Sequence, residues 1–365
     1  MPSVQRDLPV SVIISAYNSE RFIADAIRTV HGQSARPREI IVVDDGSQDR
    51  TPEIATALGA TVLKQGNAGS SAARNAGTRA ASAPWVAYLD VDDLWTPEKL
   101  DLQWQALQAA PGAGFSFCEY ATFDESGVII PDYLASNAEY AGVQGRLVGP
   151  SMVYASRERL AQQLMLANFM LPSSLVVRRD LILEIGGFDE TLRRVEDYDL
   201  FLRLLAVADA IVVERRALFY REHSASKSAA WHASLLGKNA VGERIAKNPH
   251  LYPAGAAAHF ASHRVKNINA AAEHLLRNQR YREARETALT GLVEAPSLRG
   301  LRIAWLSLIL KLWPAYHLHS ALRAFKRRHT KPVRQNRQSA AANHDLSRAL
   351  PHVASDEMFH PTSTG

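Results

Sequence analysis

Cysteine is almost missing from this chain: Cys118 is the only one among 365 residues. A single thiol can form neither an intramolecular disulfide nor a cysteine zinc cluster, so a disulfide-stapled secreted scaffold and a zinc ribbon are excluded. Residues 1–10 also lack the apolar core of a signal peptide. We therefore expect a protein of the reducing cytoplasm.

Two glycine-rich phosphate-binding motifs are also absent. No GxGxxG opens the first predicted helix, and no GxxxxGK[ST] occurs, so the usual dinucleotide and P-loop cradles are excluded. A long hydrophobic run is missing too, because Arg302, Lys311 and Pro314 interrupt the most apolar stretch, residues 301–318. A membrane-spanning helix needs about 20 continuous apolar residues, so we do not expect a single-pass anchor.

Acidic residues are absent from residues 323–337, which carry seven Lys and Arg, more than the whole net charge of +5. The rest of the chain is thus nearly neutral, which argues against a nucleic-acid-binding fold and for a local anionic contact such as lipid headgroups. Trp305, Trp313 and Tyr316 precede this run. Residues 301–318 could therefore form a helix lying on an anionic membrane surface, or an amphipathic helix packed on the catalytic domain.

Composition and length indicate a folded body with an appended region. Apolar residues make up 47% and charged residues 22%, as in soluble globular proteins. Apolar strands alternate with amphipathic helices up to about residue 100, a pattern typical of a doubly wound α/β domain. We predict a catalytic domain at 1–230 whose central sheet becomes mixed beyond residue 112, a helical region at 231–330 and a disordered tail at 331–365. Apolar runs within the catalytic domain predict further strands at 171–177, 210–213 and 218–221.

Polar side chains follow three predicted strands, at 9–15, 38–43 and 85–89. Tyr17 and Asn18 follow the first, Asp44 and Asp45 the second, and the acidic run Asp90-Val91-Asp92-Asp93 the third. Ligands bind at the carboxyl ends of parallel strands, so these groups should meet at one edge of the sheet. Tyr17 could stack on a base, Asp45 could accept from the base or ribose, and Arg74 could reach a phosphate.

The acidic run could be a solvated turn capping the helix that begins near Thr96. Alternatively, an Asp-x-Asp at a strand end suits Mg²⁺ or Mn²⁺, which prefer carboxylate oxygens and leave positions open for phosphates.

Glu196 and Asp197 open a strongly apolar helix, where acidic residues are favourable for the helix dipole alone. Their functional interpretation is a general base facing a sugar pocket. His223 could be a metal ligand or a phosphate contact, although a lone loop histidine is usually neither.

Seven ordered blocks resemble the inverting family 2 glycosyltransferases of the GT-A fold, a nucleotide-sugar-dependent group with many bacterial surface-polysaccharide enzymes. The blocks are VSVIISAYNSE (10–20), EIIVVDDGSQDRT (39–51), GNAGSSAARNAG (66–77), WVAYLDVDDLWTPEKL (85–100), GGFDE (186–190), EDYDLFLRL (196–204) and YREHSASKS (220–228). The resemblance covers about residues 9–228. It departs from the family at Ser15, where proline is usual after the first strand.

The resemblance implies a GT-A fold, with a Rossmann-like nucleotide-binding half and a mixed central sheet, and a role for each candidate residue. Asp197 of the Glu196-Asp197 pair would be the catalytic base. Asp90 and Asp92 would form the Asp-x-Asp that binds Mg²⁺ or Mn²⁺, with Asp92 the direct ligand and Asp93 behind it, and His223 is a further candidate ligand. The donor pocket would be lined by Ser15, Tyr17, Asp45 and Arg74, with Glu20 and Asp90 as further candidates.

The function expected from this resemblance is metal-dependent, inverting transfer of a sugar from a nucleotide donor, a UDP-sugar first, to a saccharide or lipid-linked acceptor. It would serve surface polysaccharide or glycolipid synthesis at the inner face of the cell membrane, with no nucleic-acid partner. One alternative is a catalytically silent nucleotide-sugar-binding scaffold, which the intact acidic residues disfavour. Another is a nucleotidyltransferase, which the lack of an N-terminal glycine-rich activating loop disfavours.

Overall fold

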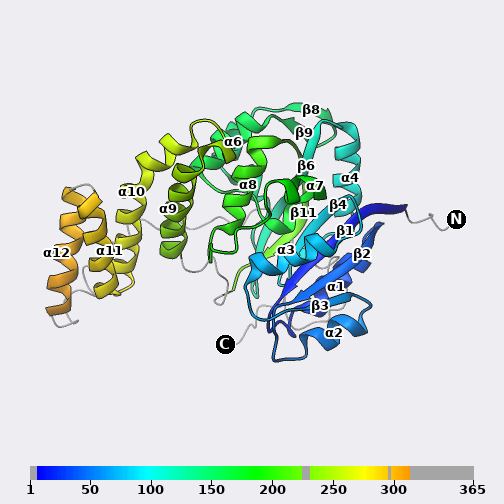
Figure 1. Cartoon of the computed structure of the whole chain (residues 1–365), viewed down its shortest axis with the longest axis horizontal. Coiled ribbons are helices and arrows are strands. Elements are labelled where there is room, and N and C mark those ends of the chain that lie inside the picture. Colours follow the sequence, from blue (N-terminus) through cyan, green and yellow to red (C-terminus); the bar gives the residue numbers. More distant parts are fainter. Residues whose placement is uncertain (1–5, 224–230, 295–296, 313–365) are drawn as a thin grey trace, which may run out of the picture. The chain divides into compact units, whose positions relative to one another are not determined.

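The computed structural model describes residues 6–223, 231–294 and 297–312 (Figure 1). These residues form two compact units. The first contains residues 6–223 and 250–254, and the second contains the remaining described residues. Segment 250–254 thus lies in the first unit although it follows the predicted domain boundary at residue 230.

One mixed sheet forms the centre of the first unit, with strand order β3-β2-β1-β4-β10-β6-β11-β9-β8, while β5 pairs with β11 and β7 with β6. The strands are β1 (Arg6–Ala16), β2 (Ala35–Asp44), β3 (Thr61–Lys64), β4 (Trp85–Asp90), β5 (Leu94–Trp95), β6 (Ala113–Asp124), β7 (Gly127–Ile130), β8 (Arg146–Gly149), β9 (Met152–Ala155), β10 (Val176–Arg178) and β11 (Asp209–Arg221). The helices are α1 (Ile23–His31), α2 (Thr51–Ala57), α3 (Ser70–Ala80), α4 (Lys99–Ala109), α5 (Tyr133–Ser136), α6 (Arg157–Leu166), α7 (Arg179–Glu184) and α8 (Glu196–Val207), with 3-10 turns η1 (Tyr140–Gly142) and η2 (Pro172–Ser174).

Strands β1 to β4 form the parallel half of the sheet. The apolar runs of β1, β2 and β4 are almost fully buried, as expected for strands covered on both faces, whereas β3 at the edge of the sheet is partly exposed. Ala16 lies opposite Asp44, and Ser15 lies opposite Asp90. The polar residues that follow β1, β2 and β4 therefore lie together at one edge of the sheet, as predicted.

Helix α3 packs closely on this half because its residues are small. A Cβ at Gly77 would lie 2.4 Å from Ile13 Cγ2 and 3.2 Å from Val43 Cγ2. The glycine therefore allows α3 to approach β1 and β2, and this places the first turns of α3 beside the ends of the strands.

The mixed half of the sheet follows the expectation for residues beyond 112, with local differences. Strand β10 is antiparallel to both β4 and β6, whereas β11 is parallel to β6. The strand predicted over 171–177 begins instead as the helical turn η2, because Pro172 opens a turn in which the Leu175 N–H bonds back to the Pro172 carbonyl at 2.9 Å. The two strands predicted at 210–213 and 218–221 are one strand, β11, with irregular register between them.

The second unit is helical, as predicted. Its helices are α9 (Trp231–Lys247), α10 (Ala256–Arg277), α11 (Tyr281–Glu294) and α12 (Leu298–Leu312). The 3-10 turn η4 (Pro249–Leu251) follows α9 in sequence and includes residues 250 and 251 of the first unit. Ala272, Ala288 and Ile303 form a core among α10, α11 and α12. Among the described helices, none is both long and apolar enough to span a bilayer. The basic run at 323–337 and the predicted tail at 331–365 lie outside the described residues.

Candidate active site

The acidic turn, residues 90–93, is held by side chains from two distant segments. Ser173 Oγ donates to Asp93 Oδ2 at 2.5 Å and accepts from the Asp90 N–H at 2.9 Å. The Arg221 N–H donates to Asp93 Oδ1 at 3.0 Å. Asp93 is fully buried, and its burial together with Asp92 and Asp90 raises its pKa well above the usual value. Asp93 therefore faces inward and supports the turn, while Asp90 and Asp92 remain accessible.

Asp92 lies beside His223, a residue 131 positions later in the chain. Its Oδ2 is 2.9 Å from His223 Nε2, and both side chains are 28% exposed. Phe22 stacks on the imidazole with ring centroids 5.6 Å apart, and the Arg221 Nε–H donates to the Asp92 carbonyl. The structure thus brings together two of the three residues predicted to surround a metal ion.

Arg74, on α3, connects the acidic turn to helix α8. Its Nη2 lies 2.5 Å from Asp90 Oδ1, and its Nη1 lies 3.4 Å from Glu196 Oε1. The guanidinium is buried and also lies over the Phe188 ring at 5.1 Å. A buried cation between two carboxylates holds all three in place, since separating them would leave uncompensated charge.

Glu196 and Asp197 begin α8, after Val195 in the left-handed conformation (φ 56°). Glu196 is buried and also accepts from Ser70 Oγ at 3.0 Å. Asp197 is only partly buried and accepts from Asn168 Nδ2 at 3.5 Å and from the Tyr198 N–H at 2.8 Å. Burial, followed by the neighbouring charge of Glu196, raises the pKa of Asp197 to about 6. Asp197 is therefore the member of this pair suited to exchange a proton near neutral pH.

The predicted donor-pocket residues lie at the carboxyl edge of β1 and β2. Tyr17 is 47% exposed, and Glu20 Oε2 accepts from the Arg50 N–H at 3.2 Å. Asp45 is buried, with Oδ1 accepting from Gln65 Nε2 and the Ala68 N–H and Oδ2 from the Gly69 N–H, each at 2.8 Å. Asp45 therefore holds the loop that leads into α3, and its contact with a nucleoside remains a prediction.

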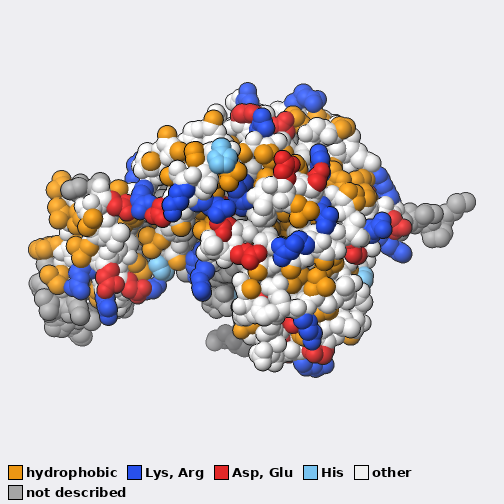
Figure 2. All heavy atoms as spheres, viewed as in Figure 1, with side chains coloured by type: hydrophobic (Ala, Val, Ile, Leu, Met, Phe, Trp, Pro, Cys, Tyr) orange, Lys and Arg blue, Asp and Glu red, His pale blue; other side chains and the backbone are white. Residues whose placement is uncertain are grey.

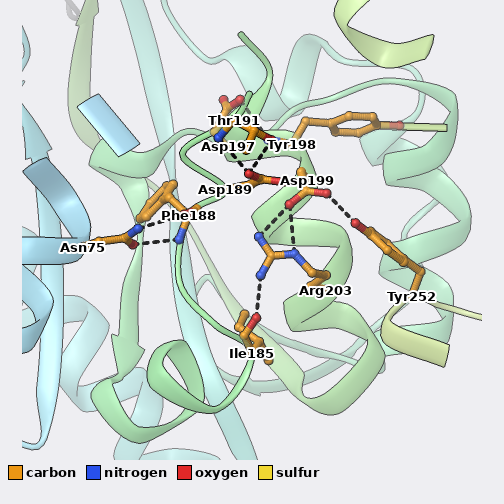
Figure 3. Close-up of polar contacts among 10 residues, drawn as sticks. All are labelled: Asn75, Ile185, Phe188, Asp189, Thr191, Asp197, Tyr198, Asp199, Arg203 and Tyr252. Carbon is orange, nitrogen blue, oxygen red and sulfur yellow. Dashed lines mark hydrogen bonds and ion pairs between the residues drawn. The ribbon is translucent and has the colours of Figure 1, made fainter. Parts of the chain in front are cut away.

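The roles of two residues of this site, Asn75 and Ser173, were not predicted from the sequence. Asn75 Nδ2 donates to the Phe188 carbonyl and its Oδ1 accepts from the Phe188 N–H, both at 2.8 Å, which fixes the GGFDE loop, residues 186–190, on α3 (Figure 3). Ser173 lies within a stretch that resembled an ordinary buried strand. Only the pairing of distant segments reveals either role.

The family resemblance implies a divalent cation, for which the acidic turn, residues 90–93, offers carboxylate oxygens. Among the described residues, no group of three His, Cys, Asp or Glu side chains is arranged to hold an ion. Asp92 Oδ2 and His223 Nε2 are hydrogen-bonded to each other at 2.9 Å, and this separation is also close to that of neighbouring ligands about 2.1 Å from one ion. This pair fits a partial protein ligand set completed by the phosphates of a substrate.

Comparison with known proteins agrees with this geometry. Residues 11–182 match the family model described as glycosyl transferase family 2. An uncharacterised glycosyltransferase of Rickettsia typhi is 29% identical over 221 residues, covering 59% of this chain and 64% of that protein. The succinoglycan biosynthesis protein ExoO of Rhizobium meliloti is 30% identical over 224 residues, covering 59% of this chain and 61% of that protein. The chain thus spans less than two thirds of the length of these relatives.

A solved structure shares the architecture. The structure of TarS residues 1–349 from S. aureus in complex with UDP superposes with a TM-score of 0.52 at 16% identity, covering 85% of this chain and 93% of that one. At this identity the likeness concerns the fold. Residues 11–182, which include the parallel half of the sheet and the acidic turn, therefore belong to glycosyl transferase family 2, and the likeness to TarS shows that the chain shares the GT-A fold.

Proposed function

We propose that this enzyme transfers a sugar from a nucleotide-sugar donor to a saccharide or lipid-linked acceptor, with inversion at the anomeric carbon. The observation that carries the proposal is Arg74, which binds Asp90 at the end of β4 and Glu196 at the start of α8. These two motifs are 106 positions apart. In the proposed site, the acidic turn would lie on one side of the bound substrates and Asp197 on the other.

The donor would bind at the edge formed by Ser15, Tyr17, Glu20 and Asp45. Tyr17 offers an exposed ring on which a base could stack, and Ser15 lies opposite Asp90 in the sheet. Uridine is the base we expect, and the UDP complex of the similarly folded TarS supports this expectation. The relationship to ExoO supports a role in polysaccharide synthesis.

Asp92 and His223, with Asp90 nearby, would hold Mg²⁺ or Mn²⁺. A bound ion would act as a Lewis acid that neutralises the departing diphosphate. Because Asp90 is paired with Arg74, Asp92 is the carboxylate of the turn that is better placed to bind the ion directly.

Asp197 would act as the general base. It accepts the proton of the acceptor hydroxyl, whose oxygen attacks the anomeric carbon while the bond from that carbon to the diphosphate oxygen breaks. The nucleoside diphosphate leaves with the bonding electron pair. One displacement from the face opposite the leaving group inverts the anomeric configuration. Glu196, already bonded to Ser70 and Arg74, would keep Asp197 at the start of α8.

A thermal-shift panel tests the donor and metal proposals together. We expect one of UDP, GDP and dTDP to raise the melting temperature of the wild type in the presence of Mn²⁺, because a ligand stabilises the state that binds it. Asp92→Ala should remove the part of this shift that depends on Mn²⁺. Asp124→Ala, at the β6–β7 turn, is the control and should keep it.

Other outcomes would change the proposal. A shift that is the same in Asp92→Ala and wild type would contradict the metal role of Asp92. Nucleotide binding without hydrolysis or transfer of any matching sugar donor would favour a catalytically silent scaffold. No shift with any nucleotide would contradict donor binding itself.

We further propose that α12 lies against an anionic membrane at the inner face of the cell membrane. Its exposed face carries an apolar stripe, Leu298, Leu301, Trp305 and Leu308, whose spacing of three and four residues follows one side of a helix. The opposite side packs through Ile303 into the core of the second unit. Apolar side chains are visible at the surface of the helices of the second unit (Figure 2). The basic run at 323–337 would complement acidic headgroups.

Sedimentation with vesicles tests the membrane proposal. Leu301→Glu with Trp305→Glu should reduce the bound fraction on vesicles of phosphatidylcholine and phosphatidylglycerol by about tenfold or more, because two charges enter the apolar face. Ile129→Glu with Leu147→Glu, two exposed apolar positions on β7 and β8, is the matched control and should bind like the wild type. Equal binding by the α12 variant and the wild type would refute the proposal.

A further inference from the structure

Helix α8 has a buried polar network on the side away from Asp197. Asp199 Oδ2 accepts from Arg203 Nε at 2.9 Å and from Nη2 at 2.6 Å, and Oδ1 accepts from the Tyr252 hydroxyl at 2.6 Å. All three side chains are buried, and Asp199 is wholly inaccessible. Figure 3 shows Arg203 and Tyr252 approaching the carboxylate from different directions.

Tyr252 comes from a part of the chain that sequence patterns place outside the catalytic domain. It lies between α9 and α10 in sequence, 31 positions after β11 ends at Arg221, yet segment 250–254 belongs to the first unit. The first unit therefore includes a short segment, residues 250–254, that follows α9 in the sequence.

The same network reaches the loop that follows α7. Arg203 Nη1 donates to the Ile185 carbonyl at 2.7 Å, immediately before the GGFDE loop. Asn75 holds the other side of that loop through the Phe188 backbone, and the Phe188 ring lies against Arg74. The contacts thus run from Tyr252 through α8 and the loop to the guanidinium that binds Asp90 and Glu196.

We propose that Tyr252 is a positioning residue for the general base, an inference that rests on the proposed function of Asp197. Residues 197 and 199 are separated by about 200° around a helix, so Asp199 faces the core when Asp197 faces the site. A short bond from a hydroxyl to a buried carboxylate is among the stronger hydrogen bonds in proteins. Tyr252 thereby fixes the rotation and position of the first turn of α8, and with it the carboxylate that must meet the acceptor hydroxyl.

Tyr252→Phe in the full chain tests this role, because it removes the hydroxyl and keeps the ring. The readouts are kcat and KM for hydrolysis of the sugar donor that matches the nucleotide selected in the thermal-shift panel, and the affinity for that nucleotide with Mn²⁺. We expect kcat to fall on the order of tenfold, since small displacements of a catalytic group are costly. Donor KM and nucleotide affinity should stay within about twofold of wild type, because the donor pocket is built from other elements.

Tyr154→Phe is the matched control. Tyr154 on β9 also donates its hydroxyl to an aspartate, Asp209, near the opposite end of α8. This variant should lower the melting temperature while leaving kcat unchanged. If Tyr252→Phe also lowers only the melting temperature and leaves kcat at the wild-type value, Tyr252 is a structural residue and the proposal is overturned.

Hydrogen exchange gives a second readout that needs no activity. Amides of residues 197–200 should exchange faster in Tyr252→Phe than in wild type, and those in Tyr154→Phe should not. Unchanged exchange there would overturn the positioning role. Failure of the proposed function would be seen differently, as a wild type that neither binds a nucleotide nor hydrolyses a sugar donor while Tyr252→Phe still alters exchange in α8.

Discussion

Replacing Asp197 by Asn should lower turnover by about a thousandfold, within the range that general-base catalysis contributes. The asparagine amide has the size of the carboxylate but cannot take up the proton from the hydroxyl of the acceptor substrate. The measurement is release of nucleoside diphosphate from the donor, together with nucleotide affinity, which should not change. Asp180→Asn, an exposed aspartate on α7 paired with Arg178, is the matched control and should retain full activity. Retained turnover in Asp197→Asn would refute its role as base.

The pH dependence of the same variant gives an independent check. Wild-type kcat/KM should be half-maximal near pH 6, the pKa of Asp197, and level off about one pH unit higher, where Asp197 is ionised. Folding raises the pKa of Asp197 above its value in the unfolded chain, so the ionised carboxylate destabilises the folded state above about pH 6. Below about pH 4, Asp197 is protonated in both the folded and the unfolded state, and this effect disappears. At pH 8, Asp197→Asn should therefore have a higher free energy of unfolding than wild type, by on the order of 1 kcal/mol after solvent screening. Its melting temperature should be correspondingly higher. This gain should vanish near pH 4.

Replacing Arg74 by Ala should have the largest effect on stability. The partly exposed Asp90 and the buried Glu196 would lose the buried cation between them, and breaking a buried ion pair in this way costs about 3–5 kcal/mol. We expect a fall in the melting temperature on the order of 10 °C for a protein of this size. Thermal unfolding measures it directly. Arg79→Ala, at an exposed position of the same helix, should be nearly neutral.

A second pair of variants distinguishes the loss of the Arg74 charge from the loss of its packing. Arg74→Met fills most of the volume but leaves the charge imbalance, and adding Glu196→Gln to it removes one of the two unpaired carboxylates. The double variant should recover part of the stability lost in Arg74→Met. If it is no more stable than the single variant, lost packing rather than uncompensated charge explains the effect.

The errors in the sequence-based predictions occur where distant parts of the chain decide the local structure. Residues 171–177 are apolar enough for a strand, but Ser173 is required at the acidic turn, and the chain forms η2 there. Strand β11 was predicted as two strands because Glu214, Arg215 and Arg216 interrupt its apolar pattern. It continues through them since β6 pairs with it on both sides of the irregularity.

The sequence by itself determined the alternation of strands and helices, the polar ends of β1, β2 and β4, and the acidic pair that opens α8. These features are local, because the period of apolar residues and the few residues that follow it contain the information. Only the tertiary structure decided that Arg74 joins Asp90 to Glu196, that His223 meets Asp92, and that Tyr252 returns to support α8. Such pairings depend on how the sheet orders its strands, and no local pattern specifies the partner of a side chain more than 50 positions away.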